Sequence, residues 1–163
     1  MTEEAAGSRS GGTGGEVRIE RIYIKDLSFE SPGAPEVFTE KWEPEMSVDI
    51  NSRTNPVSQT HYEVVLTATV RAKRAGGKTA FIAEVQQAGL FFLDGMADEL
   101  RARVLGTICP STLFPYLREA IDGLVVKGGF PALHLAPVNF DALYAQALAQ
   151  KQAQAGQPAG TTH

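Results

Sequence analysis

The sequence has almost no cysteine and no long hydrophobic run. Its single cysteine, Cys109, excludes an internal disulfide framework and a zinc site built from several cysteines. The N-terminus, Met-Thr-Glu-Glu, lacks the apolar segment of a signal peptide, and no run of about 18 apolar residues is present to span a bilayer. These absences predict a cytoplasmic protein with no membrane insertion.

Positive charge is also scarce. The net charge is −4 and the pI is near 5.4, which argues against a nucleic-acid partner, because nucleic-acid binders usually carry a basic face. Acidic residues concentrate between Asp26 and Asp49, where seven of them accompany one base, Lys41. This stretch is either a solvated face or a docking surface for a basic partner.

Composition divides the chain into one domain with two loose ends. Residues 1–16 contain five glycines and no aromatic residue, which predicts a disordered Gly-rich extension. Residues 153–163 contain glycine, glutamine, proline and threonine, which predicts a flexible tail. A single folded domain is therefore expected over residues 17–152.

The first half of this domain has the alternation of β-strands. Apolar pairs at Val17/Ile19, Ile22/Ile24 and Leu27/Phe29 are separated by three-residue gaps, so this strand either carries bulges or is buried on both faces. Alternation also predicts strands over 46–50, 61–72 and 79–87, the last two joined by a hairpin at Gly76-Gly77.

The second half has helical spacing. Helices are predicted around 96–105, from Pro110 to about Val125, and after a cap at Asn139 or Asp141. Pro115 is expected to kink or restart the second of these. Strands followed by helices indicate an α+β fold with a four-stranded antiparallel sheet. One helix layer leaves the second sheet face uncovered, which favours an oligomer.

The segment between the last two helices is the least ordinary part of the sequence. Residues 128–144 contain Pro131 and Pro137, which forbid a continuous helix, and yet the segment is strongly apolar. Surface loops are normally polar, because their backbone groups need water. The segment must therefore cover a core, line a groove or meet a partner.

No catalytic or metal site can be assembled from the sequence. The three histidines, His61, His134 and His163, do not have the spacing of metal ligands on one element. Cys109 has no recognisable base near it and is expected to be a buried apolar residue. Gly76-Gly77-Lys78-Thr79 lacks the first glycine and the strand-to-helix context of a phosphate-binding loop. We expect neither a metal nor a cofactor.

Ordered blocks of sequence resemble one known family. These blocks are Ile22–Glu30, Tyr62–Leu66, Glu84–Gly89, Cys109–Tyr116, Phe130-Pro131 and Leu135–Tyr144, the last of which begins Leu-Ala-Pro-Val-Asn-Phe-Asp. In this order they resemble the SecB protein-export chaperones of proteobacteria. The resemblance covers nearly all of residues 17–152, and both chain ends fall outside it.

The resemblance implies a cytoplasmic homotetramer, a dimer of dimers, that is not an enzyme and uses no nucleotide. Such holdases keep precursor proteins unfolded and deliver them to the SecA motor of the Sec translocase. A client groove would be formed by Trp42, Phe130, Leu133, Leu135, Phe140 and Tyr144. An acidic surface for SecA would be formed by Asp26, Glu30, Ile82 and Glu84. An oligomer interface would be formed by Ala83, Val85 and Gln87.

Two other interpretations of the apolar segment remain open at this stage. In a small-ligand oligomeric enzyme of thioesterase-like type, the segment would form an acyl pocket and Asp94 would act as the base. In a purely structural oligomer, the segment would be an interface and would bind no unfolded polypeptide. The three interpretations differ in whether the protein turns over a thioester and whether it binds unfolded chains.

Overall fold

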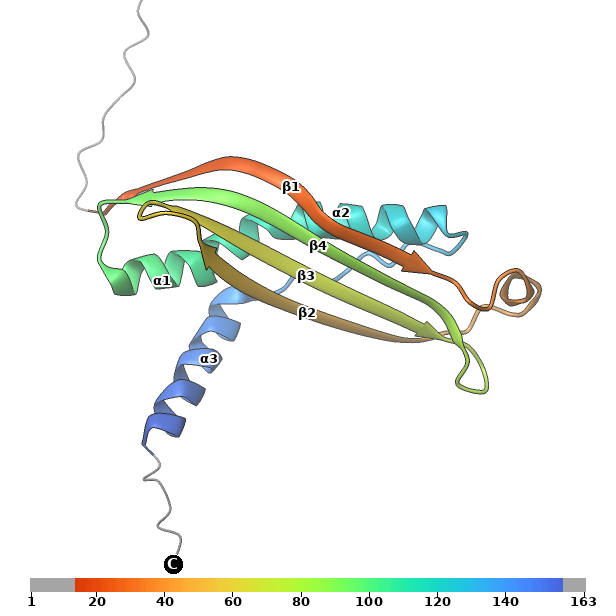
Figure 1. Ribbon diagram of the computed structural model, residues 1–163. Helices are drawn as coiled ribbons and strands as arrows, with labels where there is room; N and C mark the ends of the chain where they lie inside the picture. Colours follow the sequence, from red (N-terminus) through yellow and green to blue (C-terminus); the bar gives the residue numbers. More distant parts are fainter. Residues whose placement is uncertain (1–13, 157–163) are drawn as a thin grey trace, which may run out of the picture.

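The computed structural model describes residues 14–156 and contains one four-stranded antiparallel sheet followed by three helices. The strands are β1 (Glu16–Glu30), β2 (Glu45–Pro56), β3 (His61–Lys73) and β4 (Thr79–Asp94), in the spatial order β1-β4-β3-β2. The helices are α1 (Asp98–Gly106), α2 (Ile108–Lys127) and α3 (Phe140–Ala155). The predicted α+β fold is confirmed (Figure 1).

Strand β1 contains two irregularities that explain its spacing. The register with β4 shifts between Ile19 and Arg21 and again between Ile24 and Asp26, so of the two predicted alternatives the strand has the bulges. The two shifts restore the phase after each three-residue gap. All six apolar residues of β1 therefore share the sheet face on which the helices lie: Val17, Ile19, Ile22, Ile24, Leu27 and Phe29.

The core lies between α2 and the central strands. One face of β3 and β4 is fully buried at alternate positions, including Leu66, Val70, Phe81 and Val85. Helix α2 packs its own stripe against them, formed by Leu113, Leu117, Ile121 and Val125. Both figures show the helices on one side of the sheet. We call this side the covered face and the opposite side the outer face.

Several element boundaries differ from the predicted ones. Strand β4 extends to Asp94 rather than Gln87, because its second half continues to pair with β1 and β3. Helix α2 begins at Ile108 and continues through Pro115 as one element. A short 3-10 turn, η1 (Glu36–Thr39), precedes β2 and was not predicted.

The last helix has the predicted cap and a later end. The Asn139 side chain accepts a hydrogen bond of 3.0 Å from the Ala142 amide, which selects Asn139 over Asp141 as the cap. Helix α3 continues to Ala155, so the tail predicted from residue 153 begins inside a helix. The remainder of that tail, from residue 157, and residues 1–13 of the predicted N-terminal extension lie outside the described residues.

Candidate functional site

The apolar segment after α2 is fixed to the end of that helix by its backbone. The Gly128 amide donates to the Leu124 carbonyl at 2.9 Å, and the Phe130 amide donates to the Val125 carbonyl at 3.1 Å. Gly129 has a φ of +89°, which favours glycine, so the chain reverses here before it runs back along α2. We call residues 130–139 the connecting loop.

The connecting loop and the first residue of α3 carry four of the six residues predicted to contact a client, and three of these four are buried. Phe130 is 5% exposed, Leu135 8% and Phe140 5%, and all three belong to the core. In this structure these three side chains fill space between the sheet and the helices, and their contact with a client stays a prediction. The apolar character of the loop is explained first by the core that it covers.

Five aromatic rings gather where the connecting loop meets the residues before β2. Phe130 lies at the centre, with ring centroids 4.8 Å from Phe81, 5.0 Å from Trp42 and 5.2 Å from Phe38. Phe29 stacks on Phe81 at 5.7 Å. We call these residues the aromatic cluster.

The aromatic cluster reaches the surface at its outer members. Phe38 is 51% exposed and Trp42 is partly buried, so Trp42 keeps the exposure that a binding role needs. Sequence reasoning missed Phe38, although its position four residues before Trp42 in the acidic stretch was a signal. Two glycines make room for the rings, because a Cβ on Gly128 would lie 2.2 Å from Phe29 and one on Gly129 would lie 3.0 Å from Phe38.

The other two predicted groove residues lie in different surroundings. Leu133 is partly buried against the core. Tyr144, on α3, packs its ring on α1, where a Cβ added to Gly106 would lie 2.6 Å from it. A cavity of about 820 Å³ opens between α1 and α3 and is lined by Tyr144 and Leu148 among others. The predicted groove residues therefore do not form one continuous surface.

The residues predicted for the oligomer interface lie inside the chain. Ala83 and Val85 are fully buried on the covered face beneath α2, so in this structure they are core residues, and their role in an interface stays a prediction. Gln87 is nearly buried and donates its side-chain amide to the Tyr23 carbonyl at 3.0 Å. Sequence alternation identified the strand face correctly but not what covers it.

An uncovered apolar surface lies instead at the β1 edge of the sheet. Ile24 and Leu27 are exposed, although they share the face that α2 covers elsewhere. They line a groove of about 480 Å³ with Tyr116 and Leu124 of α2. A Cβ on Gly123, in the same groove, would meet nothing within 4 Å. We call this the β1–α2 groove.

The four residues predicted for the acidic surface do come together. Glu30 pairs with Ile82 across the β1–β4 ladder, and Ser28 pairs with Glu84, which places these side chains on the outer face with Asp26. The Glu84 carboxylate accepts a hydrogen bond of 2.9 Å from the Thr69 hydroxyl. The surface is therefore acidic with one apolar side chain, and no helix covers it.

A polar network occupies the middle of the outer face. The Glu63 carboxylate accepts hydrogen bonds from Lys25 at 2.6 Å, from the Tyr23 hydroxyl, and from Asn55 at 2.9 Å. The Lys25 bond, with help from the other two donors, lowers the pKa of Glu63 to about 2. Burial, together with the Glu63 bond, raises the pKa of Tyr23 to about 12.

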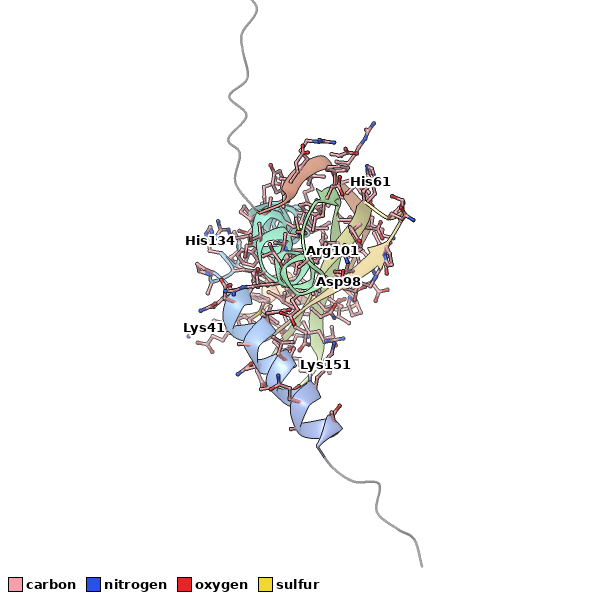
Figure 2. All side chains as sticks on the ribbon, turned by 90° about the vertical axis from the view of Figure 1, so that its left-hand side faces the viewer. Lys41, His61, Asp98, Arg101, His134 and Lys151 are labelled. Atoms are coloured by element: carbon pink, nitrogen blue, oxygen red, sulfur yellow. The ribbon has the colours of Figure 1, made fainter. Side chains whose placement is uncertain are left out.

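The residues suspected of chemistry lie apart. His61 and His134 point away from each other on opposite sides of the molecule (Figure 2), and the third histidine, His163, lies outside the described residues. Burial raises the pKa of the Cys109 thiol to about 12, which removes its nucleophilic form at neutral pH. Asp94 is exposed at the end of β4 and accepts the Gly95 amide. No group of metal-binding side chains occurs within residues 14–156.

No helix in the described part of the chain is long and apolar enough to cross a membrane.

The sequence and the fold are similar to those of known proteins. The family model described as SecB, preprotein translocase subunit, matches residues 12–151. Protein-export protein SecB of Hahella chejuensis is 55% identical over 141 residues, which are 86% of this chain and 88% of that protein. The protein of the same description from Azotobacter vinelandii is 52% identical over 163 residues, covering 99% of each.

A solved structure is similar in fold. It is a SecB-like chaperone of Mycobacterium tuberculosis in complex with a ChAD peptide from an antitoxin, with a TM-score of 0.59 and 16% identity. The match covers 75% of this chain and 90% of that one. At this identity the likeness concerns the fold alone.

Proposed function

This chain belongs to the SecB family of protein-export chaperones, and we propose that it is a cytoplasmic holdase that keeps precursor proteins unfolded and delivers them to SecA. In this proposal it uses no ATP and performs no covalent chemistry. The observation that carries it is the division of one sheet into two kinds of surface. An aromatic cluster opens on one side and acidic side chains gather on the other.

The client is proposed to bind at the exposed edge of the aromatic cluster. Phe38 and Trp42 offer apolar surface without a fixed set of hydrogen-bond partners, which suits a protein that must accept many unrelated chains. Phe130 acts behind them as the buried ring on which both pack. Binding through ring faces is tolerant of sequence, because any apolar side chain can contact them.

SecA is proposed to dock on the outer face. Asp26, Glu30 and Glu84 supply negative charge, and Ile82 supplies an apolar contact beside Glu30. A basic segment of the motor would be attracted to this surface over the range of the Debye length, about 8–10 Å at ordinary salt. Client release then needs no chemistry, because the motor competes for the client while it is docked.

Self-association into a homotetramer is proposed to use the β1–α2 groove. Its walls contain exposed apolar side chains at the edge of an open sheet, and surfaces of this kind are commonly covered by a second copy. A tetramer would have a mass of four times 17.5 kDa, roughly 70 kDa. Light scattering that finds a monomer would contradict this part of the proposal.

Two substitutions test whether the client surface and the SecA surface are distinct. Phe38→Ala should weaken binding of a reduced, unfolded polypeptide by roughly 5- to 30-fold, while SecA binding stays unchanged. Glu84→Lys should weaken SecA binding by roughly tenfold or more at low salt, while client binding stays unchanged. Calorimetry measures both. Equal losses in both titrations for either variant would show that the two surfaces are not distinct.

Matched controls exist for both the charge and the assembly. Glu99→Lys makes the same charge change at an exposed position of α1, away from the outer face and the β1–α2 groove, and it should leave SecA binding as it is in the unmodified protein. Leu27→Asp places a charge in the β1–α2 groove and should reduce the mass in solution. Val57→Asp, at an exposed position between β2 and β3, should leave the mass in solution unchanged. A full-sized assembly in Leu27→Asp would exclude this groove as the interface.

A further inference from the structure

The connecting loop has very few hydrogen bonds of its own. Within the described residues, the only ones that reach positions 131–138 come from a single side chain, Asp122 on α2. One carboxylate oxygen of Asp122, Oδ1, accepts the Leu133 amide at 2.9 Å and the His134 amide at 3.2 Å. The Asp122 side chain is only 20% exposed, so these bonds are partly shielded from water.

The backbone at this contact is strained. His134 has a φ of +49°, in the left-handed region that favours glycine, and it is the only such non-glycine residue in the described part of the chain. Two successive amides converge on one oxygen only if the chain turns sharply between them, and this conformation provides the turn. The other oxygen of Asp122, Oδ2, lies 3.5 Å from Nδ1 of His134, so the side chain adds a third contact.

We propose that Asp122 is a positioning residue for client binding: it holds the connecting loop against α2 and so fixes the aromatic cluster on which a client binds. This inference rests on the proposed function, because it assigns Asp122 a role in the same client surface. Asp122 acts through the loop and does not itself contact the client.

The path from Asp122 to the client surface is short. Phe130 begins the connecting loop three residues before Leu133, and its ring contacts Phe38, Trp42 and Phe81. Prolines 131 and 137 stiffen the chain on either side of the contact, so a displacement at Leu133 is passed along the loop rather than absorbed locally. Without Asp122, the two amides turn to water and the strained His134 relaxes, which frees Phe130 to move.

Three substitutions of Asp122 distinguish a role in positioning the loop from a role in overall stability alone. Asp122→Ala removes the acceptor, whereas Asp122→Asn keeps a side-chain oxygen that accepts the same two amides. Asp122→Glu keeps the charge but moves the carboxylate by one methylene. Glu99→Ala removes an exposed carboxylate from α1, away from the connecting loop and the β1–α2 groove, and is the matched control.

Three readouts on the full chain test the proposal. The emission of Trp42, the only tryptophan, reports the aromatic cluster. Amide hydrogen exchange at Leu133 and His134 reports the contact itself. Calorimetry with a reduced, unfolded polypeptide reports client binding. We expect Asp122→Ala to shift the Trp42 emission, to speed exchange at both amides at least tenfold and to weaken client binding at least fivefold.

Asp122→Asn and Glu99→Ala should match the unmodified protein in all three readouts, with client affinity within twofold. Wild-type emission and affinity in Asp122→Ala would overturn the proposal, as would altered emission and exchange with unchanged affinity. If Asp122→Ala does not fold, the comparison of Asp122→Asn with Asp122→Glu decides, because only the longer side chain should then alter emission and affinity.

Failure of the proposed function is distinguishable from failure of this inference. If the unmodified protein binds no unfolded polypeptide, the client proposal is wrong and the role of Asp122 in client binding falls with it. The Trp42 emission and the amide exchange would still show whether Asp122 holds the loop. If the unmodified protein does bind the polypeptide, the affinities of the Asp122 variants test the positioning role alone.

Discussion

The two faces of the sheet differ in what holds them together. On the covered face, β3 and β4 present fully buried apolar side chains, and their stabilisation comes from area removed from water. On the outer face the same two strands present Glu63, Thr69 and Glu84, whose contacts are hydrogen bonds and ion pairs. The difference follows from period-two alternation: one strand sequence builds two surfaces with unrelated physical chemistry.

The two faces of the sheet therefore offer different kinds of binding surface. Exposed apolar side chains of the covered face lie at its margins, at the aromatic cluster, in the β1–α2 groove and at Met46 and Val48 of β2, because α2 occupies the centre. The outer face offers charged side chains that no helix covers. Substitutions at the buried centre of the covered face should therefore change stability strongly, and substitutions of exposed polar side chains on the outer face should change it weakly.

The largest change in the free energy of unfolding is expected at the aromatic cluster. Phe130→Ala should lower the free energy of unfolding by about 3–5 kcal/mol, because it leaves a cavity among four other rings. Phe38→Ala, at a half-exposed ring, should cost about 1 kcal/mol or less. Urea denaturation measures both. If the two costs are equal, the distinction between a buried support and an exposed contact is wrong.

A smaller change in the free energy of unfolding is expected at the end of α2, where it packs against β1. Gly128→Ala would place a Cβ 2.2 Å from the Phe29 ring, and we expect a loss of about 1–3 kcal/mol from the displaced ring. Gly123→Ala, also near the end of α2, meets nothing within 4 Å and should gain up to about 1 kcal/mol in helix propensity. Thermal unfolding compares them. A loss at Gly123 instead would indicate that a second copy fills the β1–α2 groove.

On the outer face, the network around Glu63 gives a pH-dependent effect. The pKa of Glu63 is lowered from its ordinary value of 4.5 to about 2, so its contribution to stability is present above pH 4.5 and is lost as the pH falls towards 2. Solvent at the sheet surface screens part of it, and we expect Glu63→Gln to cost about 1–2 kcal/mol at pH 7. Denaturation at several pH values should show this difference vanish below pH 2. A difference that is constant with pH would show that the charge of Glu63 is not its cause.

The smallest effect is expected at an isolated surface ion pair. Asp49 lies 3.2 Å from Arg71 on the outer face, with most of its side chain in water. Asp49→Ala should change the free energy of unfolding by less than about 0.5 kcal/mol. Urea denaturation in parallel with Glu63→Gln makes the comparison direct. A cost above 1 kcal/mol would mean that the outer face depends on its single charge pairs as well as on its central network.

Local spacing in the sequence predicted several features correctly. The three-residue gaps in β1 predicted either bulges or burial on both faces, and the strand has bulges, which keep its apolar residues on one face. Asp26, Glu30, Ile82 and Glu84, which the family resemblance named for one surface, share the outer face. Asn139 was one of the two expected caps of the last helix. Each of these depends on residues that are close in sequence or paired in a regular ladder.

Other features could not be predicted from the sequence. Alternation placed Ala83 and Val85 on one strand face, but only the position of α2 shows that this face is buried. The proline-broken loop was apolar enough to be a groove wall or a core cover, and Phe130 and Leu135 prove to be core. Asp122 had no distinguishing signal, because an acid in a helix normally faces water.

The sequence by itself determined the α+β order, the phase of each strand and the family to which the chain belongs, because these follow from residue periods and from matching blocks of residues. The tertiary structure decided which apolar residues are core and which are exposed, because burial depends on elements far apart in the chain coming to the same place. Phe38 and Phe130 illustrate this, since both are aromatic and apolar and only packing leaves one exposed and buries the other.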